Sequence, residues 1–167
     1  HLTLSVNVSP RQFQQDNFVQ QVLDALARTS APAQRLKLEI TENLLIANVD
    51  EVIAKMALLK ARGVGFSLDD FGTGYSSLSY LNQLPIDTIK LDRQFLEQVP
   101  AVPRSTLLVA AIVELACNLQ LNVVAEGVEH EPQKAFLQSC GCHEMQGYLT
   151  GRPMSLDQLQ AFFTGPV

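Results

Sequence analysis

Short runs of the chain alternate apolar and polar residues, which is the pattern of a β-strand with one buried face. The clearest run is Leu36-Lys-Leu-Glu-Ile-Thr41. Similar runs recur along the whole sequence and are separated by longer amphipathic stretches. We predict six strands, at Leu2–Val8, Leu36–Thr41, Gly65–Leu68, Thr88–Leu91, Asn122–Ala125 and Glu144–Gln146.

Between the strands the apolar residues change to a helical period. Phe18, Val22 and Leu26 recur every four residues, which gives a helix one apolar stripe. Ser9-Pro10 opens an earlier helical region, because proline is tolerated in the first helical turn. We predict further helices at 52–59 (stopped near Gly63), 78–84 (ended before Pro85), 132–139 and 156–163, and a long one with a stripe of Leu108, Ile112, Leu115 and Leu119.

Each predicted strand is followed by helical material, and repeated βα units imply parallel strands with right-handed crossovers. An open doubly wound sheet and a (β/α)₈ barrel both fit this order. No G-x-G-x-x-G follows the first strand and no Walker loop is present. A barrel typically needs about 250 residues. The 167 residues hold about six of its eight βα units, so the barrel would be incomplete.

Polar residues fall where the predicted strands end. Taken singly, each fits a helix cap or a solvated loop residue, and Asp69-Asp70 could be an N-cap and its neighbour. In a parallel barrel, however, these positions converge on the face that carries the chemistry. The set comprises Asn7, Glu39, Glu42, Asp69, Asp70, Lys90, Asp92, Glu126, Glu129 and Gln146.

So many acids on one rim repel each other, by about 4 kcal/mol per pair at 4 Å with an effective dielectric of 20. Either several of them are protonated or cations lie among them. Carboxylate and amide oxygens favour hard ions such as Mg²⁺ or Mn²⁺. Adjacent Asp69 and Asp70 can serve two ions, and an ion pair about 3.5–4 Å apart suits phosphodiester hydrolysis. Lys90 would add positive charge for the phosphate or the attacking water. Gly72 and Gly74 would let the next loop reshape, although an ordinary turn would also contain them.

The amino-acid composition limits the classes of partner that the protein is expected to bind. The chain is 47% hydrophobic and carries 12 basic against 17 acidic residues, for a net charge of -5, which disfavours polymeric nucleic acid. No apolar run approaches the length of a membrane span, and no signal peptide is visible. Three cysteines, an odd number without zinc spacing, favour reduced thiols and a cytoplasmic location.

Two short matches are misleading. Asp70-Phe71-Gly72 imitates the kinase DFG motif, but the chain has no glycine-rich phosphate loop and no HRD motif, so a kinase is excluded. Asp24-Ala-Leu-Ala-Arg28 lies on a predicted helical stripe, so we do not take it for a strand-borne motif.

Six segments together resemble the EAL-domain family, in its order and at its spacing, across essentially the whole chain. The most specific is Asp69-Asp-Phe-Gly-Thr-Gly-Tyr-Ser-Ser-Leu78. The others are Asn7-Val-Ser9, Glu39-Ile-Thr-Glu42, Lys90-Leu-Asp-Arg93, Ala125-Glu-Gly-Val-Glu129 and Gln146-Gly-Tyr-Leu149. The resemblance implies a TIM-like barrel that hydrolyses cyclic di-GMP to linear pGpG with Mg²⁺ or Mn²⁺.

The resemblance also implies a role for each matched residue. Lys90 would orient the attacking water, Glu126 would act near the metals and as a general base, and Glu129 would support the substrate side. Glu42 would anchor the loop 71–77, and Gln146 would also support the substrate side. The metal ligands would be Asn7, Glu39, Asp69, Asp70 and Asp92, with Asp69 bridging two ions.

The sequence departs from the family pattern in one respect. The family's first strand bears Glu-Ala-Leu, usually followed by Arg, and neither is present here. We therefore expect residues 1–167 to be the C-terminal two-thirds of an EAL domain, with weak or no hydrolysis. Uncovered sheet edges would then favour a homodimer or a swapped assembly.

Alternatives remain open at this point. A receptor would bind cyclic di-GMP without cutting it, and an enolase-like proton abstractor would also place acids on successive strand ends. Family members often carry upstream GGDEF, PAS or membrane-sensor domains, so the parent protein could be membrane-anchored.

Overall fold

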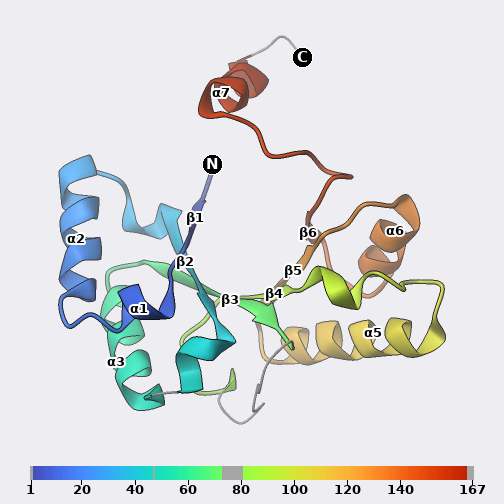
Figure 1. Ribbon diagram of the computed structural model, residues 1–167, viewed down its shortest axis with the longest axis horizontal. Coiled ribbons are helices and arrows are strands. Elements are labelled where there is room, and N and C mark those ends of the chain that lie inside the picture. The colour runs from blue at the N-terminus through green and yellow to red at the C-terminus, as the bar shows by residue number, and fades with distance from the viewer. Residues whose placement is uncertain (1, 47, 73–80, 165–167) are drawn as a thin grey trace.

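Six parallel strands form one sheet in which neighbours in space are also neighbours in sequence (Figure 1). The computed structural model describes residues 2–46, 48–72 and 81–164. The strands are β1 (Leu4–Asn7), β2 (Leu36–Thr41), β3 (Gly65–Phe71), β4 (Thr88–Leu91), β5 (Asn122–Glu126) and β6 (Glu144–Gln146). A doubly wound sheet reverses its strand order at a switch point. The uninterrupted order β1 to β6 instead matches the incomplete barrel that the sequence predicts.

The helices lie outside the sheet (Figure 1). They are α1 (Pro10–Phe13), α2 (Phe18–Thr29), α3 (Val49–Lys60), α5 (Pro103–Asn118), α6 (Glu131–Ser139) and α7 (Leu156–Thr164), with short 3₁₀ turns η1 (Ala33–Arg35), η2 (Glu42–Ile46) and η3 (Arg93–Phe95). Asp24–Arg28 lies within α2, so this segment is helical as expected. Residues 78–80 of the helix predicted over 78–84 lie outside the described residues; of the rest, Leu81 is helical and residues 82–84 form a turn and a bend. None of the described helices combines the length and apolarity needed to cross a bilayer.

The predicted stripe of α5 is displaced by one residue from the face that packs on the sheet. Val109, Val113 and Ala116 are the buried residues of this helix, whereas the predicted Leu108 keeps 49% of its surface exposed. Leucine and isoleucine occupy both faces of this helix, so periodicity alone could not separate them. Smaller side chains pack against the strands, and Ile112 and Leu119 lie at the border of the core.

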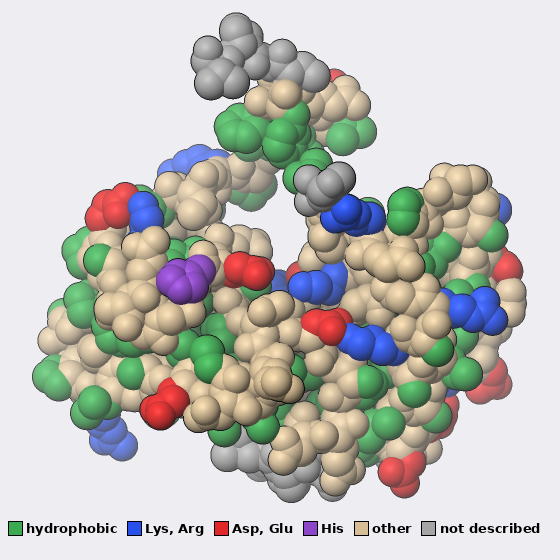
Figure 2. All heavy atoms as spheres, turned by 180° about the vertical axis from the view of Figure 1, so that it is seen from behind, with side chains coloured by type: hydrophobic (Ala, Val, Ile, Leu, Met, Phe, Trp, Pro, Cys, Tyr) green, Lys and Arg blue, Asp and Glu red, His purple; other side chains and the backbone are tan. Residues whose placement is uncertain are grey.

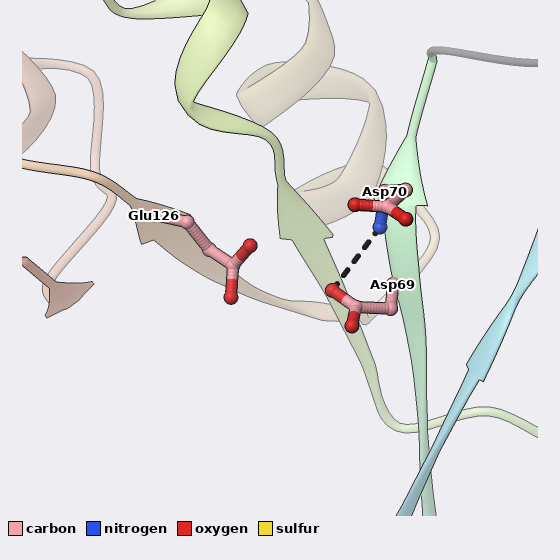
Figure 3. A group of neighbouring side chains, drawn as sticks. All are labelled: Asp69, Asp70 and Glu126. Carbon is pink, nitrogen blue, oxygen red and sulfur yellow. Dashed lines mark hydrogen bonds between the residues drawn. The ribbon is translucent and has the colours of Figure 1, made fainter. Parts of the chain in front are cut away.

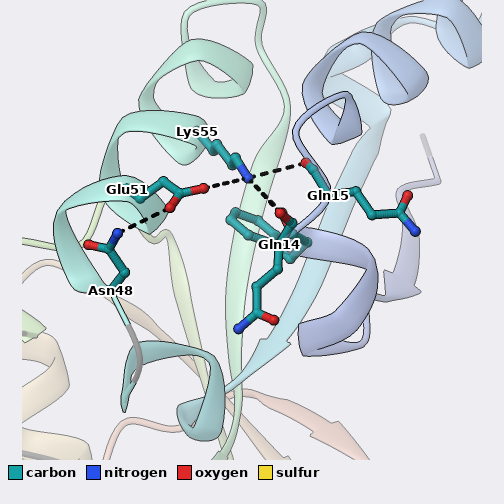
Figure 4. Close-up of polar contacts among 6 residues, drawn as sticks. Gln14, Gln15, Asn48, Glu51 and Lys55 are labelled. Carbon is teal, nitrogen blue, oxygen red and sulfur yellow. Dashed lines mark hydrogen bonds and ion pairs between the residues drawn. The ribbon is translucent and has the colours of Figure 1, made fainter.

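A lysine on α3 ties down the segment that leaves β1 (Figure 4). Lys55 Nζ donates to the backbone carbonyls of Phe13, Gln14 and Gln15, each at 3.2 Å, and pairs with Glu51 at 2.8 Å. Those carbonyls follow the single turn of α1, where few backbone partners exist. Lys55 therefore connects the segment that follows β1 to α3, which in turn contacts β3.

The sheet is open among the described residues, because β1 pairs only with β2 and β6 only with β5. Figure 2 shows this gap from behind, below the apolar side chains of α7. Leu4 on β1 is 65% exposed and Phe162 on α7 is 72% exposed. An apolar groove of about 410 Å³ runs along β1, β2 and α2. These are the uncovered edges expected of a barrel that lacks two βα units.

Candidate active site

A buried lysine gathers carboxylates from three other strands. Lys90 on β4 is only 6% exposed. Its Nζ lies 2.8 Å from Glu39 Oε2, 3.1 Å from Asp69 Oδ1 and 2.7 Å from Glu126 Oε1. These acids come from β2, β3 and β5, so consecutive strands present their carboxyl ends to one point. One cation against three anions leaves this cluster with excess negative charge.

Burial and neighbouring charges shift the pKa values of two members of the cluster, Lys90 and Glu126. Burial alone would lower the pKa of Lys90, but its hydrogen bonds to Glu126 and Glu39 and the charge of Asp69 outweigh it and raise this pKa. Burial raises the pKa of Glu126, Lys90 opposes this rise, and the charges of Asp69 and Glu39 reinforce it. Lys90 therefore stays protonated, and Glu126 holds a proton more readily than an isolated glutamate does.

An irregularity in β3 brings two adjacent carboxylates together. Leu68 pairs with Ile89 and Phe71 with Leu91, so three steps along β3 match two along β4. This extra residue is a β-bulge, and Asp70 within it has a left-handed φ of 54°. Side chains normally alternate between the faces of a strand. The bulge breaks that alternation, so the adjacent Asp69 and Asp70 carboxylates both lie near Glu126 (Figure 3).

Three of these acids form a set suited to a hard cation. One oxygen from each of Asp69, Asp70 and Glu126 lies within 4.8 Å of the other two (Figure 3). Burial raises the pKa of Asp70, and the charges of Asp69 and Asp92 raise it further. A shared cation relieves this repulsion, and all-oxygen donors are the ligands of Mg²⁺, Mn²⁺ and Ca²⁺. The residues present therefore fit a divalent metal.

Two more predicted ligands, Asn7 and Asp92, lie at the ends of β1 and β4. Asn7 ends β1 directly beside Glu39 in the sheet register, and its side chain is exposed. Asp92 follows β4, where its Oδ1 accepts a hydrogen bond from Gln94 N at 2.8 Å and caps η3. The metal roles of both residues remain predictions.

The side chain of Glu42 reaches Gly72, at the described start of the glycine-rich loop. Its Oε1 accepts a hydrogen bond from Gly72 N at 2.7 Å. Gly72 has a φ of 90°, and a Cβ there would lie 2.7 Å from the ring of Phe95, so both conformation and space require glycine. Residues 73–77 of the predicted loop, including Gly74, lie outside the described residues.

The last two predicted residues lie at the side of the site. Gln146 ends β6 and is the register partner of Glu126. Glu129 follows β5 by three residues, and both side chains are exposed. Their proposed role toward a substrate depends on this position beside the Lys90 cluster.

The sequence analysis did not identify Gln133, a buried glutamine that contacts the loop after β5. Gln133 Oε1 accepts hydrogen bonds from Glu129 N and His130 N, each at 3.0 Å, while Nε2 donates to Leu96 O at 2.9 Å. A signal was available, because glutamine three residues after a helix cap is typical of a capping box. Here histidine occupies the cap position, which obscured the pattern.

Comparison with known proteins gives consistent matches. A family model described as the EAL domain matches residues 1–153. The cyclic di-GMP phosphodiesterase NbdA of Pseudomonas aeruginosa is 43% identical over 161 residues, which are 96% of this chain and 21% of NbdA. The chain thus spans about a fifth of that relative's length.

Solved structures agree in sequence and in shape. The phosphodiesterase PaMucR in complex with c-di-GMP is 44% identical with a TM-score of 0.89, over 94% of this chain and 64% of that one. The manganese and cyclic di-GMP complex of BlrP1 from Klebsiella pneumoniae is 31% identical with a TM-score of 0.83, over 90% of this chain and 39% of that one.

Proposed function

Because this chain belongs to the EAL domain family, we propose that it binds cyclic di-GMP and hydrolyses it to linear pGpG. The observation that carries the proposal is the convergence of Glu39, Asp69 and Glu126 on Lys90, next to the carboxylate of Asp70. Relatives named as cyclic di-GMP phosphodiesterases support the substrate.

We propose a divalent metal centre, with Mg²⁺ or Mn²⁺ as the resident ions. Asn7, Glu39, Asp69, Asp70 and Asp92 would hold them, and Asp69 would serve both. When bound, such ions lower the pKa of a coordinated water and neutralise charge on the phosphate. The manganese and cyclic di-GMP complex of BlrP1 supports a divalent ion in a relative of this chain.

The residues around the centre would divide the remaining work. Lys90 stays protonated, so it would donate hydrogen bonds and positive charge to the attacking water or the phosphate. Glu126, whose pKa is raised, would accept the proton of that water. Glu42 would hold the loop through Gly72, while Glu129 and Gln146 would contact the substrate from the side of β5 and β6.

We further propose that residues 1–167 alone turn over slowly. The sequence contains no Glu-Ala-Leu tripeptide, whose glutamate would complete the metal ligands in the family. The same observation favours a second candidate function, a receptor that binds cyclic di-GMP without cutting it.

The test is a Mn²⁺-dependent assay that follows pGpG by chromatography together with cyclic di-GMP binding by calorimetry. We expect binding with slow release of pGpG, loss of both in Glu39→Gln, and no change in Gln138→Leu on the exposed face of α6. Addition of an upstream segment that carries Glu-Ala-Leu should restore turnover. Binding without any pGpG in the extended protein would favour the receptor, and absence of binding in both forms would contradict the proposal.

A further inference from the structure

The buried side chain of Gln133 joins two segments that leave neighbouring strands. It lies on α6 and is 6% exposed. Its oxygen accepts from the amides of Glu129 and His130, which follow β5. Its nitrogen donates to the carbonyl of Leu96, which follows β4 and η3. Both ends of one amide are therefore satisfied by backbone groups from separate loops.

The same two segments touch at a second point, nearer the Lys90 cluster. Gly127 has a φ of 67°, and a Cβ there would lie 2.4 Å from the Cβ of Arg93. The backbone after β5 therefore lies directly on η3. The contact at Gly127 and the hydrogen bonds of Gln133 join the segment after β4 and the segment after β5 into one structural unit.

This unit carries acids of the proposed site. Asp92 caps the start of η3, Glu126 ends β5, and Glu129 lies between Gly127 and Gln133. An opening of about 280 Å³ separates the loops at the surface, and Arg93, Glu97, Glu129, His130 and Gln133 are among the residues that line it.

We propose that Gln133 is a positioning residue, which sets the place of Glu129 for ligand binding by holding the 127–130 loop against the segment after η3. It would act through Glu129 and would not contact the reacting atoms. This inference rests on the proposed function, because it assigns Glu129 to the binding of cyclic di-GMP.

The competing explanation is a simple helix cap. Gln133 is the third residue of α6 and accepts from the cap residue His130, as in an ordinary capping box. A cap, however, needs only the acceptor oxygen. The bond from Nε2 to Leu96 O has no capping role, so it separates the two explanations.

The variant Gln133→Glu isolates that bond. Glutamate is the usual capping-box partner, so it keeps the acceptor for Glu129 N and His130 N, while its second oxygen replaces the donor to Leu96 O by an acceptor that repels this carbonyl. Gln133→Leu removes both functions. Gln138→Glu, on the exposed face of the same helix, is the matched control for added charge.

The readouts are amide hydrogen exchange in residues 93–99 and 127–130, and the Kd for cyclic di-GMP. In Gln133→Glu we expect exchange in 93–99 to accelerate and the Kd to rise, each about tenfold, the factor that corresponds to one lost hydrogen bond. Helix α6 should stay protected in this variant and lose protection in Gln133→Leu. Binding repeated at about 0.5 M salt screens the added charge, and the loss of affinity should persist.

Wild-type exchange and wild-type Kd in Gln133→Glu would overturn the inference and leave only the cap. The same holds if the loss of affinity disappears at high salt while exchange in 93–99 is unchanged. Failure of the wild-type chain to bind cyclic di-GMP would instead contradict the proposed function, and exchange in 93–99 would still show whether the tie between the loops exists.

Discussion

Lys90 is the single residue on which the site depends. It is the only cation in contact with Glu39, Asp69 and Glu126 among the described residues, and these acids would otherwise repel each other in a partly buried position. The cluster shows why the individual strand-end acids were weak signals in the sequence. Their meaning comes from convergence, which only the fold supplies.

Lys90→Met should destabilise the protein, because it leaves buried carboxylates without their counter-charge. Breaking a buried ion pair costs about 3 kcal/mol. Urea unfolding without divalent ions should show a loss of this order, and Mn²⁺ should restore part of it by supplying positive charge. Lys134→Met, which breaks only an exposed pair with Glu131, serves as the control. An unchanged midpoint for Lys90→Met would mean that the acids are already neutral.

Cys142 should be unreactive at neutral pH. Burial raises the pKa of its thiol to about 11, against weaker lowering by backbone hydrogen bonds. At pH 8 roughly one molecule in a thousand then carries a thiolate there. A thiol reagent should label exposed Cys117 rapidly and Cys142 only on unfolding.

Because the folded-state pKa of Cys142 lies above the unfolded one, this thiol also makes the free energy of unfolding fall as pH rises from about 9 towards 11. Rapid labelling of all three cysteines at pH 8 would contradict this burial.

At the scale of elements, periodicity predicted all six strands, and three of them with the bounds observed. It failed on α5, where apolar residues occupy more than one face. It also could not predict the bulge in β3, because the extra residue is defined by pairing with β4 and not by any local pattern. That bulge brings the Asp69 and Asp70 carboxylates together near Glu126. The sequence analysis named all three acids as candidate site residues, but it could not predict the bulge that groups them.

Lys55 should matter for stability although it lies outside the site. It satisfies three backbone carbonyls and one carboxylate between α3 and the segment after α1 (Figure 4). Lys55→Met should lower the free energy of unfolding by about 1–3 kcal/mol, because those carbonyls lose a charged donor. Lys55→Arg should retain most of it. Amide exchange in residues 5–15 should accelerate in the Met variant, and equal stability of both variants would show that water replaces the ammonium.

For the whole molecule, the open sheet is the dominant feature. Leu4 and Val6 on β1 are exposed and line the apolar groove beside α2, at one end of the open sheet. The sequence predicted this opening from the count of βα units. The count of βα units carries no information on what covers the opening.

We expect the 167-residue chain to associate in dilute solution. Light scattering should give a mass above the 18.4 kDa of one chain. Leu4→Lys should reduce association by placing charge on the edge strand, whereas Leu58→Lys, at an exposed position on α3, should not. A compact monomer of wild-type protein would mean that the edges are covered within one chain.

The central claim is that oxygen donors from separate strands gather at one end of the sheet to hold divalent metal. The most direct measurement is anomalous diffraction from crystals of this chain soaked in Mn²⁺. We expect a peak within coordination distance of Asp69 and Asp70, and its loss in Asp70→Asn. A peak elsewhere, or carboxylates that stay paired with Lys90 with no peak beside them at saturating Mn²⁺, would contradict this claim.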